Sequence, residues 1–129
     1  MTANVLVIED NEQNLYLTTF LLENRGYTVF SAVDGPRGIE LAMAIAPDII
    51  LLDIQLPAMD GYAVARHLRG IKALERTSIV AVTSYAMLGD REKSLAAGCD
   101  GYIEKPINPL TFVAEIERAA AGRDRSERP

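Results

Sequence analysis

The 129-residue sequence predicts an α/β fold in which helices cover both faces of a five-stranded parallel sheet. Short, continuous apolar runs recur along the chain, and three of them stop abruptly at polar residues. Such runs fit strands that are buried on both faces of a parallel sheet, whereas strands with one solvated face alternate. Segments with helical spacing separate the runs, so strand and helix alternate five times. Right-handed crossovers leave few topologies for this alternation, and the flavodoxin-like strand order 2-1-3-4-5 is the common small one.

The individual elements follow from composition and spacing. The clearest strand candidates are residues 5–8, 49–52 and 79–82, and weaker candidates are residues 28–32 and 101–104. Helices are expected over residues 12–25, 36–46, 61–68, 87–97 and 109–121. The glycines that follow the first and fourth of these segments are typical of helix ends. Phe20 lies on the apolar stripe of the first segment, and Leu110 lies on that of the last.

Length and composition predict a single domain. A chain of 129 residues with 49% apolar and 24% charged residues has the usual globular balance. We expect residues 1–121 to form the domain. Residues 122–129, which hold three arginines and two acids, are expected to be a flexible tail.

Charge and sequence signals exclude several classes of function. The formal net charge of -5 argues against a protein that grips nucleic acid through its phosphates. Cys99 is the only cysteine, so neither an internal disulfide nor a cysteine metal cage is possible. The longest apolar run, residues 41–46, is too short to span a membrane, and no secretory signal precedes the first strand. We therefore expect a cytoplasmic protein that contacts neither nucleic acid nor membrane directly.

Polar side chains follow four of the five predicted strands. Glu9 and Asp10 follow the first strand, Asp53 the third, Thr83 the fourth and Lys105 the fifth. Ligands of open parallel sheets bind beyond these carboxyl ends, so we expect the groups to converge. Two like charges about 4 Å apart repel by roughly 4 kcal/mol at an effective dielectric constant near 20, which favours a bound cation. An all-oxygen site indicates Mg²⁺, which also accepts phosphate oxygens.

Helix capping is an alternative role for the acids, because acidic residues after a buried strand often cap the next helix. Either Asp10 or Asn11 could cap the first predicted helix. Capping alone does not explain why four separate strand ends carry groups that suit one metal and phosphoryl site.

These motifs resemble those of a response-regulator receiver domain. The shared pieces are Glu9-Asp10, Asp53, Pro57-Ala58-Met59-Asp60-Gly61, Thr83-Ser84 and Lys105-Pro106, and the match runs from Asn4 to Ala121. Within that family, the stretches at 53–57, 81–83, 86–87, 89–90 and 98–99 resemble a single-domain cell-cycle regulator. Each piece alone is weak, but the pieces are specific in this order and at these spacings.

The resemblance implies a metal site. Asp10, Asp53 and the backbone carbonyl of Gln55 would bind Mg²⁺ directly, and Glu9 would act mostly through a bound water. Such a metal offsets the repulsion between the carboxylates and incoming phosphoryl oxygens.

The resemblance also implies the chemistry. Asp53 would accept a phosphoryl group from a histidine kinase or a histidine phosphotransfer protein. Lys105 would pair with that group, and the Thr83 hydroxyl would donate a hydrogen bond to it. The protein would be a signalling switch that catalyses only its own phosphorylation and dephosphorylation.

A conformational switch is implied as well. Phosphorylation adds a charge of about -1.5 to -2, toward which Thr83 would move, and Tyr102 would then turn inward. In the family, this couples the site to a protein-binding face made by the fourth helix, the fifth strand and the fifth helix. The bond between Lys105 and Pro106 resembles the usual cis peptide of the family, although sequence does not determine the isomer.

Ser84, Tyr85 and Pro106 would also line the site. Ser84 is small and leaves the phosphoryl entrance open, while Gln55 and Tyr85 would flank the path of attacking water. A bulky Tyr85 is expected to slow hydrolysis, and an unchanged dephosphorylation rate in Tyr85→Ala would contradict this.

Three alternatives to a standalone receiver differ from it in sequence or in context. An aspartyl-phosphate phosphatase would carry a second aspartate where Gln55 stands, and a flavin module would need a phosphate-binding loop where Glu9 and Asp10 stand. A receiver excised from a hybrid kinase or a longer regulator keeps the same fold. Met1 and the short length after residue 121 favour a standalone regulator.

Overall fold

The computed structural model describes residues 3–56, 59–84 and 89–126. Its elements in chain order are β1 (Asn4–Ile8), α1 (Glu12–Asn24), β2 (Thr28–Ala32), α2 (Gly35–Ile45), β3 (Ile49–Asp53), α3 (Gly61–Arg69), the 3₁₀ turn η1 (Lys72–Leu74), β4 (Ser78–Thr83), α4 (Asp90–Ala96), β5 (Gly101–Glu104) and α5 (Phe112–Ser126).

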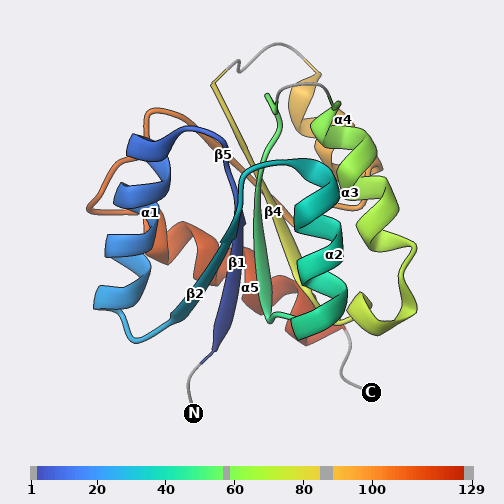
Figure 1. Ribbon diagram of the computed structural model, residues 1–129, viewed down its shortest axis with the longest axis horizontal. Coiled ribbons are helices and arrows are strands. Elements are labelled where there is room, and N and C mark those ends of the chain that lie inside the picture. The colour runs from blue at the N-terminus through green and yellow to red at the C-terminus, as the bar shows by residue number, and fades with distance from the viewer. Residues whose placement is uncertain (1–2, 57–58, 85–88, 127–129) are drawn as a thin grey trace.

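The strands form one parallel sheet in the order β2-β1-β3-β4-β5, which confirms the flavodoxin-like topology predicted from the sequence. Helices α1 and α5 cover one face of the sheet, and α2, α3 and α4 cover the other (Figure 1). Two clusters of buried apolar side chains correspond to these two faces. Because all four pairs of neighbouring strands are parallel, all five strands end at the same edge.

Burial explains which strands were easy to predict. Every residue of β3 and β4 is buried, as expected for central strands that read as continuous apolar runs. The edge strand β2 is partly exposed, which accounts for its weaker apolar signal.

Side-chain caps fix the starts of three helices. Asn11 accepts a hydrogen bond from the Asn14 amide at 2.9 Å and is the N-cap of α1. Asp34 caps α2 and Asp60 caps α3 in the same way. Asp10 is therefore not a capping residue, and its carboxylate is exposed at the edge of the sheet.

Several predicted details were wrong. Helix α5 begins at Phe112 and not at residue 109, because Asn108 forms a turn in which its Oδ1 atom accepts the Leu110 amide at 3.0 Å. Leu110 is therefore 93% exposed. Helix α1 buries Thr18 and Leu22, whereas Phe20, which was placed on its apolar stripe, is 53% exposed. The helix is apolar on more than one face, so its buried stripe could not be read from periodicity alone.

The ends of two other segments differ from the prediction or lie outside the described residues. Helix α5 continues to Ser126, five residues past the expected end. The described part of α4 starts at Asp90, and residues 85–88, which include the predicted start, lie outside the described residues. The division into a domain of residues 1–121 and a flexible tail stays a prediction. Among the described helices, none has both the length and the hydropathy of a membrane span.

Candidate functional site

Three carboxylates meet at the carboxyl edge of the sheet. Glu9 directly follows β1, and Asp53 is the last residue of β3, the strand that pairs with β1. One oxygen from each of Glu9, Asp10 and Asp53 lies within 4.8 Å of the others. Glu9 and Asp53 are only 6% and 5% exposed, whereas Asp10 is open to solvent. The convergence predicted from the strand ends is thus present.

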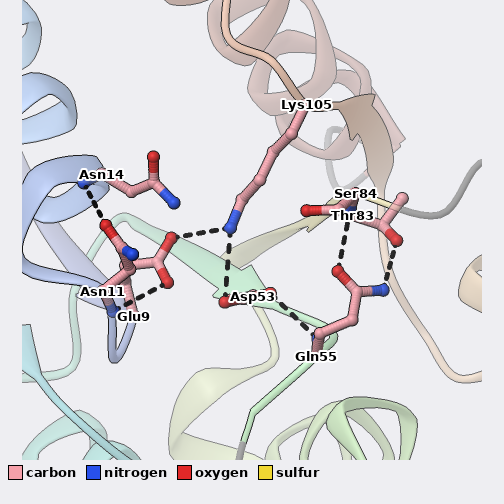
Figure 2. A network of polar contacts seen from close by, with 8 residues as sticks. All are labelled: Glu9, Asn11, Asn14, Asp53, Gln55, Thr83, Ser84 and Lys105. Atoms are coloured by element: carbon pink, nitrogen blue, oxygen red, sulfur yellow. Dashed lines mark hydrogen bonds and ion pairs between the residues drawn. The ribbon is translucent and has the colours of Figure 1, made fainter.

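Lys105 reaches into this acidic cluster from the end of β5. Its Nζ atom lies 2.9 Å from Glu9 Oε1 and 3.4 Å from Asp53 Oδ2 (Figure 2). Its backbone amide donates to the Thr83 carbonyl at 2.7 Å, which fixes the start of the side chain beside β4. The peptide bond between Lys105 and Pro106 is cis.

Burial shapes the charge of the cluster. Removal from water, followed by a hydrogen bond with the Asp53 carboxylate, raises the pKa of Glu9 to a net value of about 7. The Lys105 ammonium opposes both effects and lowers the Glu9 pKa. Glu9 therefore gains or loses its negative charge near neutral pH.

The donor set fits a hard divalent cation. All three side chains offer carboxylate oxygens, and one of them faces solvent, so an ion could enter while keeping part of its water shell. The backbone amide of Gln55 donates to Asp53 Oδ1 at 2.9 Å, which orients the carboxylate. The role predicted for the Gln55 carbonyl as a ligand stays a prediction.

The Gln55 side chain makes contacts that sequence reasoning missed. Its Nε2 atom donates to Thr83 Oγ1 at 2.5 Å, and its Oε1 atom accepts the Ser84 amide at 2.8 Å (Figure 2). Thr83 is fully buried at the end of β4, and Ser84 is exposed. No pattern in the sequence specifies the rotamer of a single glutamine. The strand register, in which Asp53 pairs with Val82, is what places residue 55 beside the end of β4.

The other predicted residues lie as follows. Tyr102 in β5 is partly buried and packs against the core cluster on the α2–α4 side of the sheet. Burial, followed by the nearby Asp90 carboxylate, raises the pKa of the Tyr102 hydroxyl. Tyr85, together with Pro57 and Ala58 of the predicted motif, lies outside the described residues.

Comparison with known proteins defines the class of this fold and site. The family model described as the response regulator receiver domain matches residues 5–117. The chain therefore belongs to the response regulator receiver domain family, whose members act in two-component signalling.

Curated relatives narrow the class. The polar-differentiation response regulator DivK of Brucella ovis is 39% identical over 117 residues, which cover 91% of this chain and 95% of DivK. The DivK of Brucella anthropi is 38% identical over the same shares of both chains. These relatives agree with the resemblance to a single-domain cell-cycle regulator.

Solved structures agree with this fold. The chemotaxis response regulator CheY4 of Vibrio cholerae has a TM-score of 0.87 at 26% identity, covering 92% of this chain and 99% of its own. The receiver domain of the sensor histidine kinase PA1611 of Pseudomonas aeruginosa has a TM-score of 0.84 at 32% identity, covering 94% and 99%. That receiver was solved with a magnesium ion coordinated in its active site cleft.

Proposed function

We propose that this protein is a single-domain response regulator in which Asp53 accepts a phosphoryl group from a histidine kinase or a histidine phosphotransfer protein. The observation that carries the proposal is the position of the Asp53 carboxylate. One of its oxygens accepts the Gln55 amide at 2.9 Å, and the other lies 3.4 Å from Lys105 Nζ. Glu9 and Asp10 lie beside it.

The transfer uses the residues of this site in distinct roles. An oxygen of the ionised Asp53 carboxylate attacks phosphorus, and the bond from phosphorus to the donor histidine nitrogen breaks. The electron pair of that bond stays on the nitrogen. Lys105 and the Thr83 hydroxyl offer hydrogen bonds to the phosphoryl oxygens, and such positioning and charge neutralisation account for most of the catalysis in this type of reaction.

Glu9, Asp10 and Asp53 are the side chains that would hold Mg²⁺, with the Gln55 carbonyl as a further ligand. When bound, this ion supplies Lewis-acid neutralisation of the charge on the transferring group. The oxygen-only donor set and the magnesium reported for the PA1611 receiver support this assignment.

The phosphorylated state would act through protein contacts. Thr83 would move toward the phosphoryl group, and Tyr102 would turn inward on β5. This change would alter the face that α4, β5 and α5 form, where a downstream protein would bind. The partial burial of Tyr102 against the core supports its part in this coupling. Hydrolysis of the aspartyl phosphate would reset the switch, and Ser84, Tyr85 and Pro106 would line its entrance.

Two contexts are compatible with this chemistry. The DivK relatives, of which 95% is covered, favour a standalone regulator. The similarity to the PA1611 receiver supports the second candidate, a receiver that belongs to a hybrid histidine kinase. The cytoplasmic location expected from the sequence stays a prediction.

The test is phosphorylation by a small donor. Wild type, Asp53→Asn and Asp34→Asn are incubated with acetyl phosphate and Mg²⁺, and their intact masses are measured. Asp34→Asn makes the same chemical change after the edge strand β2, and asparagine caps α2 as well as aspartate does. We expect one phosphoryl adduct on wild type and Asp34→Asn and none on Asp53→Asn. No adduct on wild type, or equal adducts on wild type and Asp53→Asn, would overturn the proposal.

A further inference from the structure

The Gln55 carboxamide connects two strands beyond the end of their backbone pairing. The ladder between β3 and β4 ends where Asp53 pairs with Val82, and the last backbone bond between the strands runs from the Ile54 amide to the Val82 carbonyl at 3.0 Å. Beyond this point the segments that follow β3 and β4 diverge. The Gln55 side chain continues the connection, since it donates to Thr83 Oγ1 and accepts the Ser84 amide.

Gln55 contacts both sides of the site at once. Its backbone amide donates to Asp53 Oδ1 at 2.9 Å, while its side chain bonds to the end of β4 (Figure 2). One residue therefore fixes the Asp53 carboxylate relative to Thr83. Glutamine is suited to this task because its carboxamide offers one acceptor and two donors in a plane. Ser84 is exposed, so the carboxamide also holds its amide in place at the solvent boundary.

We propose that Gln55 is a positioning residue for phosphoryl transfer, which acts in the unphosphorylated protein by holding Thr83 and Ser84 in the arrangement from which the reaction at Asp53 starts; the movement of Thr83 follows the transfer. This inference rests on the proposed function. Groups that stabilise a transferring phosphoryl group contribute most when their positions are set before the reaction. Small displacements of such groups reduce rates by one or two orders of magnitude. The role is separate from any metal contact of the Gln55 backbone carbonyl, because it belongs to the side chain alone.

The experiment compares Gln55→Met with wild type. Methionine keeps the length and most of the volume of glutamine but has no amide group. We expect phosphorylation of Asp53 by acetyl phosphate to be about ten-fold slower in Gln55→Met. Gln13→Met, the same substitution at an exposed position of α1, is expected to react at the wild-type rate. A rate in Gln55→Met equal to or above that of wild type would overturn the inference.

A double-mutant cycle separates positioning from general stability. Thr83→Ser keeps the hydroxyl oxygen that accepts the Gln55 amide, whereas Thr83→Val removes it. Gln55→Met should slow the reaction about ten-fold in the Thr83→Ser background and about three-fold or less in the Thr83→Val background. Equal losses in the two backgrounds would show that Gln55 does not act through Thr83, and would overturn the inference.

Hydrogen exchange tests the contact independently of the reaction. In Gln55→Met, the Ser84 amide should exchange about ten-fold faster than in wild type, while amides in the middle of β4 keep their rates. An unchanged Ser84 rate would overturn the inference. Absence of an adduct on wild type would instead overturn the proposed function, so the two failures are distinguishable.

Discussion

Lys105 and Glu9, which are 96 positions apart in the chain, form a buried ion pair in which Nζ lies 2.9 Å from Oε1. The Lys105 side chain is 11% exposed and that of Glu9 is 7% exposed. The same ammonium lies 3.4 Å from Asp53, so a single positive charge serves two buried carboxylates. The lysine that would bind the phosphoryl group therefore already offsets part of the negative charge of the resting site.

Lys105→Met should destabilise the protein. Removal of the ammonium raises the Glu9 pKa further, so the buried Glu9 and Asp53 carboxyl groups must either repel each other or bind a proton. Breaking one side of a buried ion pair typically costs about 3 kcal/mol or more. We expect a loss of that size in the free energy of unfolding, measured by urea denaturation at pH 8 without divalent ions. A ligand that binds only the folded state stabilises it. Mg²⁺ should restore more stability to this variant than it adds to wild type, because the cation replaces the charge neutralisation that Lys105 supplies in wild type.

Lys72→Met is the matched control for this substitution. Lys72 is exposed in the η1 turn, so its loss should change the free energy of unfolding by no more than about 0.5 kcal/mol. Equal effects of the two substitutions would contradict the importance of the Lys105 ion pairs.

Gly61→Ala should also be strongly destabilising, for a steric reason. A Cβ atom on Gly61 would lie 2.5 Å from Ile54 Cα and 2.6 Å from the Ile54 carbonyl oxygen. These are backbone atoms and cannot move aside as a flexible side chain can, and Ile54 directly follows Asp53. We expect a loss of about 2 to 3 kcal/mol in urea denaturation, together with slower phosphorylation.

Gly70→Ala provides the comparison. Its Cβ would come no closer than 3.5 Å to the His67 carbonyl oxygen, and the φ angle of -79° suits any residue. Alanine should be neutral there or stabilise the protein by up to about 1 kcal/mol through the unfolded state. If Gly61→Ala were as mild as Gly70→Ala, the close approach to Ile54 would be refuted.

The convergence of Glu9, Asp10, Asp53, Thr83 and Lys105 could be predicted because topology determines it. Parallel strands place their carboxyl ends together, so residues just after those strands must meet. Which of these groups pair with each other could not be predicted. The preference of Lys105 for Glu9 depends on side-chain rotamers and on the depth of burial, which no linear pattern encodes.

For the helices, too, their presence could be predicted, whereas their exact ends and buried faces could not. Their existence followed from periodicity and from glycine and proline signals. The late start of α5 depends on one hydrogen bond from Asn108, and the exposed Phe20 depends on how α1 rotates against the sheet. The Gln55 contacts form where two backbones separate, which is where sequence patterns are least informative.

Arg69→Lys should reveal a structural network away from the site. The Arg69 guanidinium donates hydrogen bonds to the Gly98, Leu74 and Thr77 carbonyls at 3.0, 3.2 and 3.1 Å and to Asp100 Oδ2 at 2.9 Å. It thereby connects the end of α3 to the segments before β4 and β5. Lysine cannot reproduce a planar fork of donors, so we expect a loss of about 2 to 3 kcal/mol in the free energy of unfolding.

Arg66→Lys, one turn earlier on the exposed face of α3, is the matched control for Arg69→Lys. It should change stability by no more than about 0.5 kcal/mol. A mild effect of Arg69→Lys in the same assay would mean that ordered water replaces the lost contacts.

Cys99 should be chemically inert in the folded protein. Burial raises the pKa of its thiol from 9.0 to about 12, and the residue is only 5% exposed. Since the thiolate is the reactive form, its reaction with an aromatic disulfide reagent at pH 8 should be about 1,000-fold slower than that of an exposed thiol. The control is Cys99→Ser carrying Ser31→Cys, which places the single thiol on the exposed edge of β2. Equal labelling rates in the two proteins would contradict the burial of Cys99.

The same thiol should make stability fall at alkaline pH. An unfolded thiol ionises near pH 9, whereas the folded one keeps its proton until about pH 12. Between these values the folded state binds one proton more than the unfolded state, so the free energy of unfolding decreases as pH rises. Burial of Tyr27 raises the pKa of its hydroxyl to about 12 and adds a similar slope that begins near pH 10.

The variant Cys99→Ala removes only the contribution of the thiol. We therefore expect the difference in unfolding free energy between wild type and Cys99→Ala, measured by urea denaturation, to be constant below pH 8 and to shift steadily against wild type above pH 9. A difference that stays constant up to pH 11 would show that Cys99 ionises equally in both states.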